Sequence, residues 1–444
     1  MKNIYSFLAN AWQEILQEQK LNKSFLPFLL ILITLPTIMA INNVSTAIFI
    51  LSVLIFNRNS KVSTQVTLLV PILLFVWMAA SYFWTVDVSR TTAAISKEIT
   101  LFLIPVTFLL MRPFSKDQIL KLLKYYGYAM VFYAVFFLLR ASVRYLISGD
   151  QRAFFYHGEY DDDFGLVPKL LNAIHVSVYV AVAFFYFLSK EIRSKLDVLC
   201  ASILFVFIFL LSSKNIIIVF LFLIGIHFFY FSKSSNKMRL RNLTIFILVV
   251  GSILSFSKIK NRFLVEFQSN TNTSISHNVY NEANEGVNYI SIYEAWNNEK
   301  FTQSDYFPGT AFRVYQFRMF LEIFKEEPIF WEGLGLNASL HKLKEKELKY
   351  NLYPVYGSFN FHNQYVQNFA ELGFVGFLLL IVILFLNIKK AIHNKDFLHI
   401  SFGILMISLF LTESFLWRQT GVLYFIIFYC LFNNKNEYKK LKNE

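Results

Sequence analysis

The residues best suited to chemistry in this 444-residue chain are His362 and Asn363, which stand at the end of a polar stretch and just before a long apolar segment. A neutral imidazole in such a place can act as a general base and take a proton from a hydroxyl group. Gly373 and Gly376 follow inside the apolar segment, where small residues let a helix pack closely against its neighbours. We therefore interpret His362 as a catalytic residue. The alternative is a polar residue at a membrane boundary.

Arg313 is a second candidate. Apolar residues recur at helical spacing over residues 310–327 and stop at Pro328, which predicts a helix there. Arg313 falls on the apolar arc of this helix, whereas Arg318 and Glu322 are one turn apart on the polar side. A guanidinium on an apolar arc needs a partner, and a phosphate suits its bidentate fork. The alternatives are an arginine that snorkels to the helix edge or one that pairs with a loop carboxylate.

Two short stretches follow Pro328. Gly333 and Gly335 allow a tight turn with the backbone close to another element, which predicts a structural role. A second helix is predicted at about 338–350. It is rich in Lys and Glu, so we interpret its His341 as solvated.

Composition sets the class of protein that carries these residues. The chain is 56% hydrophobic and only 16% charged, which does not suit a soluble surface. Crossing a bilayer takes about 20 mostly apolar residues per helix. Segments near that length predict an all-α polytopic membrane protein with twelve spans, at roughly 25–41, 44–57, 66–84, 93–111, 122–147, 170–189, 196–211, 214–231, 242–257, 363–387, 396–412 and 419–433.

Lys and Arg gather in alternate connections, and such basic connections stay on the cytoplasmic side. We therefore expect both termini in the cytoplasm and one large exported loop between spans nine and ten. The net charge of +13 is then a topology signal, and no nucleic-acid partner is required. The expected divisions are a cytoplasmic interfacial segment, nine spans, a periplasmic loop, three spans and a cytoplasmic tail, at 1–24, 25–257, 258–361, 362–433 and 434–444.

Three other features have structural interpretations. Cys200 and Cys430 fall inside apolar spans, so a disulfide or a cysteine-based metal site is not expected. The acidic run Glu159, Asp161, Asp162 and Asp163 is interpreted as a solvated loop, with an acceptor or cation contact as the alternative. His227 lies toward the cytoplasmic end of span eight and is interpreted as structural.

With these features in place, the chain resembles the O-antigen ligase and polymerase-like integral membrane glycosyltransferases. Those ligases have twelve spans, a large periplasmic loop between spans nine and ten, and a motif of His, Asn or a similar residue, nine positions, Gly, two positions and Gly. This sequence matches it at His362, Asn363, Gly373 and Gly376. The resemblance extends to Arg313, to Pro328 with Gly333-Leu334-Gly335, to Ser81–Val88 and, more loosely, to His175–Tyr179.

One position departs from the family. Where the family has a Ser-Arg pair at the exported turn between spans seven and eight, this chain has Ser212-Ser213-Lys214-Asn215. Lysine keeps the positive charge but lacks the bidentate fork, so Lys214 is expected to be a point-charge phosphate contact. Asn363, His175 and Tyr179 are further candidates for substrate binding.

The resemblance implies an enzyme of the bacterial inner membrane that moves a glycan from undecaprenyl diphosphate to an acceptor hydroxyl, with inversion and without a cofactor. His362 is then the base toward the acceptor, and Arg313 and Lys214 stabilise the leaving diphosphate without a metal. The acceptor is the lipid A core for a ligase, or a second lipid-linked glycan for a polymerase. A protein-directed oligosaccharide transferase of the same superfamily stays open. So does a transporter or flippase, although the paired broken helices that favour one are not evident.

Overall fold

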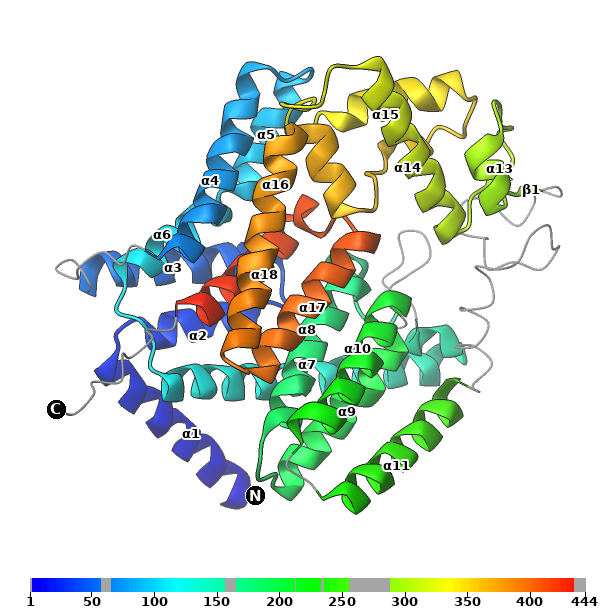
Figure 1. Ribbon diagram of the computed structural model, residues 1–444. Coiled ribbons are helices and arrows are strands. Elements are labelled where there is room, and N and C mark those ends of the chain that lie inside the picture. The colour runs from blue at the N-terminus through cyan, green and yellow to red at the C-terminus, as the bar shows by residue number, and fades with distance from the viewer. Residues whose placement is uncertain are drawn as a thin grey trace.

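The computed structural model describes residues 2–56, 65–155, 165–211, 213–232, 235–254 and 288–434, and in this part the chain is almost entirely helical (Figure 1). Its strands are two residues each, β1 (Asn288–Tyr289) and β2 (Asp305–Tyr306), and they pair in parallel. The predicted all-α class is confirmed.

Each predicted span overlaps one or two helices. In chain order the helices are α2 (Phe25–Thr34), α3 (Met39–Phe56), α4 (Val66–Ala80), α5 (Val88–Glu98) with α6 (Thr100–Leu110), α7 (Lys116–Ser148), α8 (Ala173–Ser189), α9 (Lys195–Leu211), α10 (Lys214–Ile226) with the π-helical turn η4 (His227–Phe231), α11 (Asn236–Leu254), α16 (Gln364–His393), α17 (Phe397–Thr412) and α18 (Gln419–Asn433). Short 3-10 turns lie at Ser81–Phe83, Gln151–Phe154, Lys169–Leu171, Tyr356–Ser358 and Phe415–Trp417.

Length separates these helices into groups. In the described residues six stretches are long and apolar enough to cross a membrane: Met39–Phe56, Val66–Phe83, Val88–Leu110, Lys116–Ser148, Lys214–Phe231 and Gln364–His393. Four more are apolar but shorter, namely Phe25–Thr34, Ala173–Ser189, Phe397–Thr412 and Gln419–Asn433. The chain is therefore a polytopic membrane protein, and the helices α9 and α11 occupy the remaining two predicted positions.

The core of the bundle lies along α18. From Val422 to Phe432 every side chain is almost completely buried, and α8 is enclosed to a similar degree. In Figure 1, α14 and α15 lie at one end of the bundle, and α16 contacts both of them. We call this end the site end. The buried Cys200 and Cys430 are free thiols, as expected.

The N-terminal segment, predicted to be interfacial, forms a helix, α1 (Lys2–Leu21). It is held against α7 by ion pairs, because Lys124 Nζ lies 2.6 Å from Glu14 Oε2 and Lys121 binds Glu18. Its placement on the membrane surface stays a prediction.

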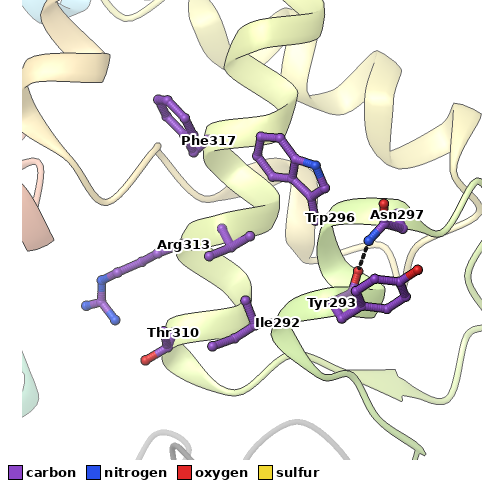
Figure 2. A pocket seen from close by; sticks show the side chains of 8 residues that line it. Ile292, Tyr293, Trp296, Asn297, Thr310, Arg313 and Phe317 are labelled. Atoms are coloured by element: carbon purple, nitrogen blue, oxygen red, sulfur yellow. Dashed lines mark hydrogen bonds between the residues drawn. The ribbon is translucent and has the colours of Figure 1, made fainter.

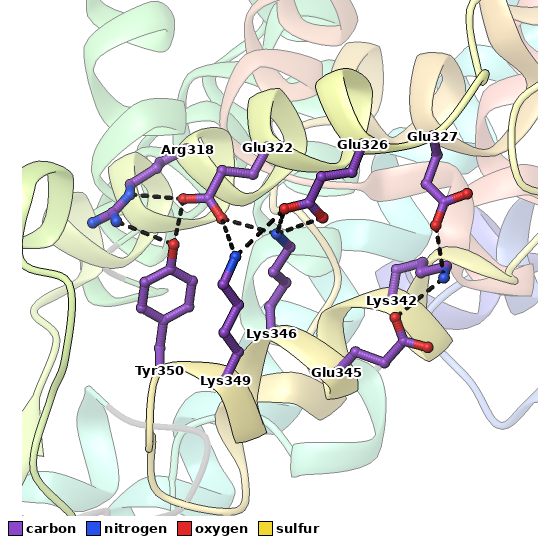
Figure 3. Close-up of polar contacts among 9 residues, drawn as sticks. All are labelled: Arg318, Glu322, Glu326, Glu327, Lys342, Glu345, Lys346, Lys349 and Tyr350. Carbon is purple, nitrogen blue, oxygen red and sulfur yellow. Dashed lines mark hydrogen bonds and ion pairs between the residues drawn. The ribbon is translucent and has the colours of Figure 1, made fainter.

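At the site end, three helices cover the bundle: α13 (Ile292–Asn297), α14 (Gly309–Glu326) and α15 (Ser339–Lys349). The helices predicted at 310–327 and 338–350 are thus confirmed as α14 and α15. Ion pairs join α14 to α15 (Figure 3): Lys346 Nζ lies 2.9 Å from Glu322 Oε2 and 2.8 Å from Glu326 Oε1. Arg318 Nε lies 3.1 Å from Glu322 Oε1, as its position one turn away predicts.

Candidate functional site

Three side chains from distant parts of the sequence meet at the site end. His362 Nδ1 lies 3.3 Å from Glu413 Oε2, and Arg313 Nη2 lies 2.9 Å from Glu413 Oε1. Arg313 comes from α14, His362 stands just before α16, and Glu413 directly follows α17. The two residues predicted to be catalytic are therefore brought together by a carboxylate that binds both.

Arg313 is fixed by more than the carboxylate. Its Nε donates to the carbonyl of Thr412 at 3.0 Å, and its Nη1 donates to the carbonyl of Gly309 at 3.1 Å. A guanidinium has five N–H donors, so three have protein acceptors among the described residues and two are left for a ligand. The pairing with a carboxylate was one of the alternatives for Arg313, and it leaves part of the fork available to a phosphate.

Arg313 also borders a groove between α13 and α14 with a volume of about 740 Å³. Figure 2 shows Trp296 and Phe317 side by side in this groove, whereas the guanidinium of Arg313 extends away from α13. The charged end of Arg313 therefore faces Glu413, and its aliphatic stem contributes to the groove.

The charge of Glu413 is set by its neighbours. Burial raises the pKa of this carboxyl, but the hydrogen bonds and charges of His362 and Arg313 outweigh that effect and hold the pKa below its ordinary value. Glu413 is thus a carboxylate at neutral pH. It accepts the Nδ1 proton of His362 and leaves Nε2 as the basic nitrogen, as in carboxylate-oriented histidines of other enzymes.

The sequence did not point to Glu413. The available signal was an acidic residue at the end of a predicted span, at 396–412, and on the same side as His362. That signal indicates a site only once His362 and Arg313 are known to contact the same carboxylate.

His362 does not belong to the helix that follows it. His362 has φ of 48°, in the left-handed region, and α16 begins at Gln364. Asn363 is the N-cap, and its Oδ1 accepts from the backbone N–H groups of Tyr365 and Val366 at 3.0 and 3.1 Å. The Asn after the histidine thus positions the helix end, and its contact with substrate stays a prediction.

Gly373 interrupts α16 instead of continuing it. It has φ of 63° and ψ of −165°, a conformation that side chains other than glycine rarely adopt. A Cβ on Gly373 would lie 2.3 Å from the Trp331 carbonyl carbon, and a Cβ on Gly333 would lie 2.3 Å from the carbonyl carbon of Glu371. The two glycines therefore let two backbones meet, which confirms a close approach as the reason for Gly333.

Backbone hydrogen bonds join these two segments. Leu334 N–H donates to Ala370 O at 2.9 Å, Gly335 N–H to Glu371 O at 2.9 Å, and Phe374 N–H to Phe330 O at 2.7 Å. The break at Gly373 also brings neighbouring turns together, since a Cβ on Gly376 would lie 2.2 Å from Leu372 Cβ.

The segment Ser81–Val88 packs on the same turn. A Cβ on Gly335 would lie 2.2 Å from Thr85 Oγ1. Trp84 Nε1 donates to Glu332 O at 2.9 Å, and Val86 N–H donates to Leu334 O at 3.0 Å. Three of the pieces that resemble the family, Ser81–Val88, the Gly333–Gly335 turn and the break at Gly373, thus form a single packed unit.

Lys214 is the first residue of α10, at the same end of the bundle. The next residue, Asn215, donates from Nδ2 to Thr412 Oγ1 at 2.8 Å and to the carbonyl of Ser408 at 3.0 Å. The start of α10 is therefore tied to the end of α17, next to Glu413. A role for Lys214 in phosphate binding stays a prediction.

His175 and Tyr179 lie in α8 and are buried. His175 Nδ1 lies 3.2 Å from Thr420 Oγ1, and its ring centroid lies 4.4 Å from that of Phe415. The Tyr179 ring packs against Tyr424 at 4.5 Å. Both residues therefore support the segment after Glu413, and no contact joins them to His362 in the described part.

The remaining sequence candidates lie elsewhere. His227 belongs to η4, at the other end of α10 from Lys214, and is buried. His341 is exposed, as predicted, and its Nε2 lies 3.3 Å from Glu345 Oε1. Asp161, Asp162 and Asp163 lie outside the described residues. Within the described ranges, no group of three or more His, Cys, Asp and Glu side chains is placed to hold a metal ion.

Comparison with known proteins found one similarity that covers most of these features. A search of curated proteins found no match. Residues 199–381 match the family model described as O-antigen ligase, and this stretch includes Lys214, Arg313, His362 and both glycine pairs. With its apolar helices, the chain is a multi-pass protein of the bacterial inner membrane, and its residues 199–381 are similar to the O-antigen ligase family.

Proposed function

We propose that this chain transfers a glycan from undecaprenyl diphosphate to a hydroxyl of the lipid A core on the periplasmic face of the inner membrane. The observation that carries the proposal is the contact of His362 with Glu413, whose other oxygen binds Arg313. A base oriented by a carboxylate stands beside a cation with donors left for a phosphate.

The proposed reaction is a direct displacement. Nε2 of His362 takes the proton of the acceptor hydroxyl as its oxygen bonds to the anomeric carbon. The bond from that carbon to the diphosphate oxygen breaks, and the leaving diphosphate carries the electron pair. Arg313 and, as a point charge, Lys214 stabilise that negative charge. Attack from the face opposite the leaving group inverts the anomeric carbon.

Gene deletion tests this function and separates ligase from polymerase. We expect the deletion strain to accumulate polymer on the lipid carrier that is not attached to the lipid A core, as seen by gel analysis of surface polysaccharide. Single repeats attached to the core would instead identify a polymerase. A normal polysaccharide pattern would contradict both functions.

The metal-free mechanism is tested on the purified protein. Transfer from the lipid-linked donor should continue in EDTA, because the two cations take the part that a divalent ion has in other transferases. Reversible loss of transfer in EDTA, restored by a divalent ion, would contradict this mechanism and direct attention to Asp161, Asp162 and Asp163.

A further inference from the structure

The first turns of α16 carry four polar side chains that lie in the protein interior. Gln364, Gln367, Asn368 and Glu371 are each exposed by 3% or less. A buried polar group is costly unless it is hydrogen-bonded. The partners of these side chains therefore show what this part of the helix holds in place.

Gln367 binds segments from both sides of the candidate site. Its Oε1 accepts from the backbone N–H of Phe361 at 3.1 Å and from Ser414 Oγ at 3.3 Å. Phe361 immediately precedes His362, and Ser414 immediately follows Glu413. One amide oxygen thus joins the neighbours of both members of the His362–Glu413 pair.

The other end of the Gln367 amide is anchored. Its Nε2 donates to Glu371 Oε1 at 2.5 Å and to Ser339 Oγ at 3.1 Å, and Ser339 Oγ donates to the same Glu371 oxygen at 2.7 Å. The backbone N–H of Phe361 can only donate, so the amide oxygen must face it and the NH₂ group must face Glu371. The orientation of Gln367 is therefore determined by its partners.

Gln364 adds a second tie to the segment after Glu413. Its Oε1 accepts from the backbone N–H of Leu416 at 2.7 Å, and its Nε2 donates to Asn368 Oδ1 at 2.7 Å. The start of α16 therefore holds the segment 414–416 at two points, through Gln364 and Gln367. It holds Phe361, the residue before His362, through Gln367.

We propose that Gln367 is the positioning residue that sets His362 against Glu413. This inference rests on the proposed function, because it assigns Gln367 a part in the reaction of that site. His362 and Glu413 are 51 residues apart in the sequence, and their contact of 3.3 Å is long for a hydrogen bond. A small displacement of either segment separates them, and a misplacement of about 1 Å can cost a reaction about a hundredfold in rate.

The test compares two buried glutamines replaced by methionine, which is similar in size. Gln316, in α14, is 1% exposed, and neither its amide nitrogen nor its oxygen has a hydrogen-bond partner in the described part of the chain. Gln316→Met therefore removes a buried amide without cutting a tie to the site. We expect Gln367→Met to lower kcat roughly ten- to a hundredfold with little change in KM for the lipid-linked donor, and Gln316→Met to leave both nearly unchanged.

A double substitution separates positioning from a general loss of structure. If Gln367 acts through the His362–Glu413 contact, Gln367→Met should cost little further activity in a protein that already carries Glu413→Gln. The reason is that substitutions of residues that act through one contact do not have additive effects on free energy. Full multiplication of the two losses would overturn the inference. Near wild-type kcat in Gln367→Met would overturn it as well.

Hydrogen exchange tests the junction without the reaction. The amide protons of Phe361 and of residues 414–416 should exchange faster in Gln367→Met than in wild type or Gln316→Met. Unchanged exchange in both segments overturns the inference whatever the activity. If exchange rises while His362→Ala keeps full activity, the junction stands and the proposed function fails.

Discussion

Two arginines on α14 illustrate two different uses of the same side chain. Arg313 and Arg318 are five residues apart, which places them about 140° apart around the helix. Arg318 binds Glu322 and, at 3.3 Å, the Tyr350 hydroxyl (Figure 3). It also donates to the Asn298 carbonyl at 2.7 Å, so all of these contacts lie within the unit formed by α13, α14 and α15, here called the α13–α15 unit. Arg313 reaches out of that unit to Glu413 of the bundle.

The environments of the two partners differ as well. Glu322 also binds Lys346 and the Tyr350 hydroxyl, so its carboxylate is shared among residues that join helices. Glu413 is shared between a cation and an imidazole that could exchange a proton with substrate. A carboxylate used only between helices indicates structure, whereas one that orients a titratable group beside unused donors indicates chemistry.

The largest expected effect is on His362. His362→Ala should lower glycan transfer by roughly 10²- to 10⁴-fold, the usual contribution of a general base, while membrane insertion and expression stay normal. His341→Ala is the matched control, because that histidine is exposed and pairs only with Glu345 among the described residues. Near-normal transfer by a well-expressed His362→Ala protein would remove His362 from the mechanism.

Glu413 should come next. Glu413→Gln keeps the size of the side chain but removes the charge that holds both Arg313 and His362. We expect a loss of transfer of roughly ten- to a hundredfold, the range for a charge-assisted contact worth about 1.5–3 kcal/mol. Assays of the purified protein with a lipid-linked donor measure it. If Glu413→Gln were fully active, the meeting of His362 and Arg313 at this residue would have no functional meaning.

The sequence predicted Arg313, His362, the glycine turn and α14, because each leaves a local pattern of period, charge or glycine. It did not predict Glu413, because the contacts that define its role span 51 and 100 residues and depend on how α14, α16 and α17 meet. It also missed the break at Gly373, since apolar periodicity passes through a glycine without showing its φ. The backbone approach that requires the break comes from Trp331 and Glu332, in another segment.

The two arginines can be compared directly by the same conservative change. Arg313→Lys should impair transfer with little change in thermal stability, since lysine keeps a charge toward Glu413 but not the fork. Arg318→Lys should lower the thermal unfolding temperature in detergent while the activity of the folded fraction stays near wild type. The reverse pattern would contradict the division between a structural and a chemical arginine.

The smallest expected effect is a pH dependence of stability, and it comes from the carboxylates that join α14 to α15 beside Arg318. Burial raises the pKa of Glu322, but the hydrogen bonds of Lys346 and Tyr350 outweigh burial. The pKa of Glu322 in the folded protein is therefore below the ordinary 4.5. The pKa of Glu326 is lowered mainly by its hydrogen bond with Lys346. Groups of this kind contribute stability above their unfolded pKa, and the contribution is lost as pH falls through the folded value.

We therefore expect the unfolding temperature of the wild-type protein to fall on acidification below about pH 4.5. It should fall less steeply in Lys346→Met, because the hydrogen bonds of Lys346 make the largest of the contributions that lower the pKa of Glu322 and of Glu326. Lys325→Met is the control, since it removes an exposed lysine from α14, the helix that carries Glu322 and Glu326, and should keep the wild-type slope. Identical slopes in Lys346→Met and wild type would show that the ion pairs between α14 and α15 do not set the acid stability. Glu413 lies outside the ion pairs that Lys346 makes with Glu322 and Glu326. Glu413→Gln should therefore keep the wild-type dependence of the unfolding temperature on pH, so that the stability of the α13–α15 unit is separated from the chemistry beside it.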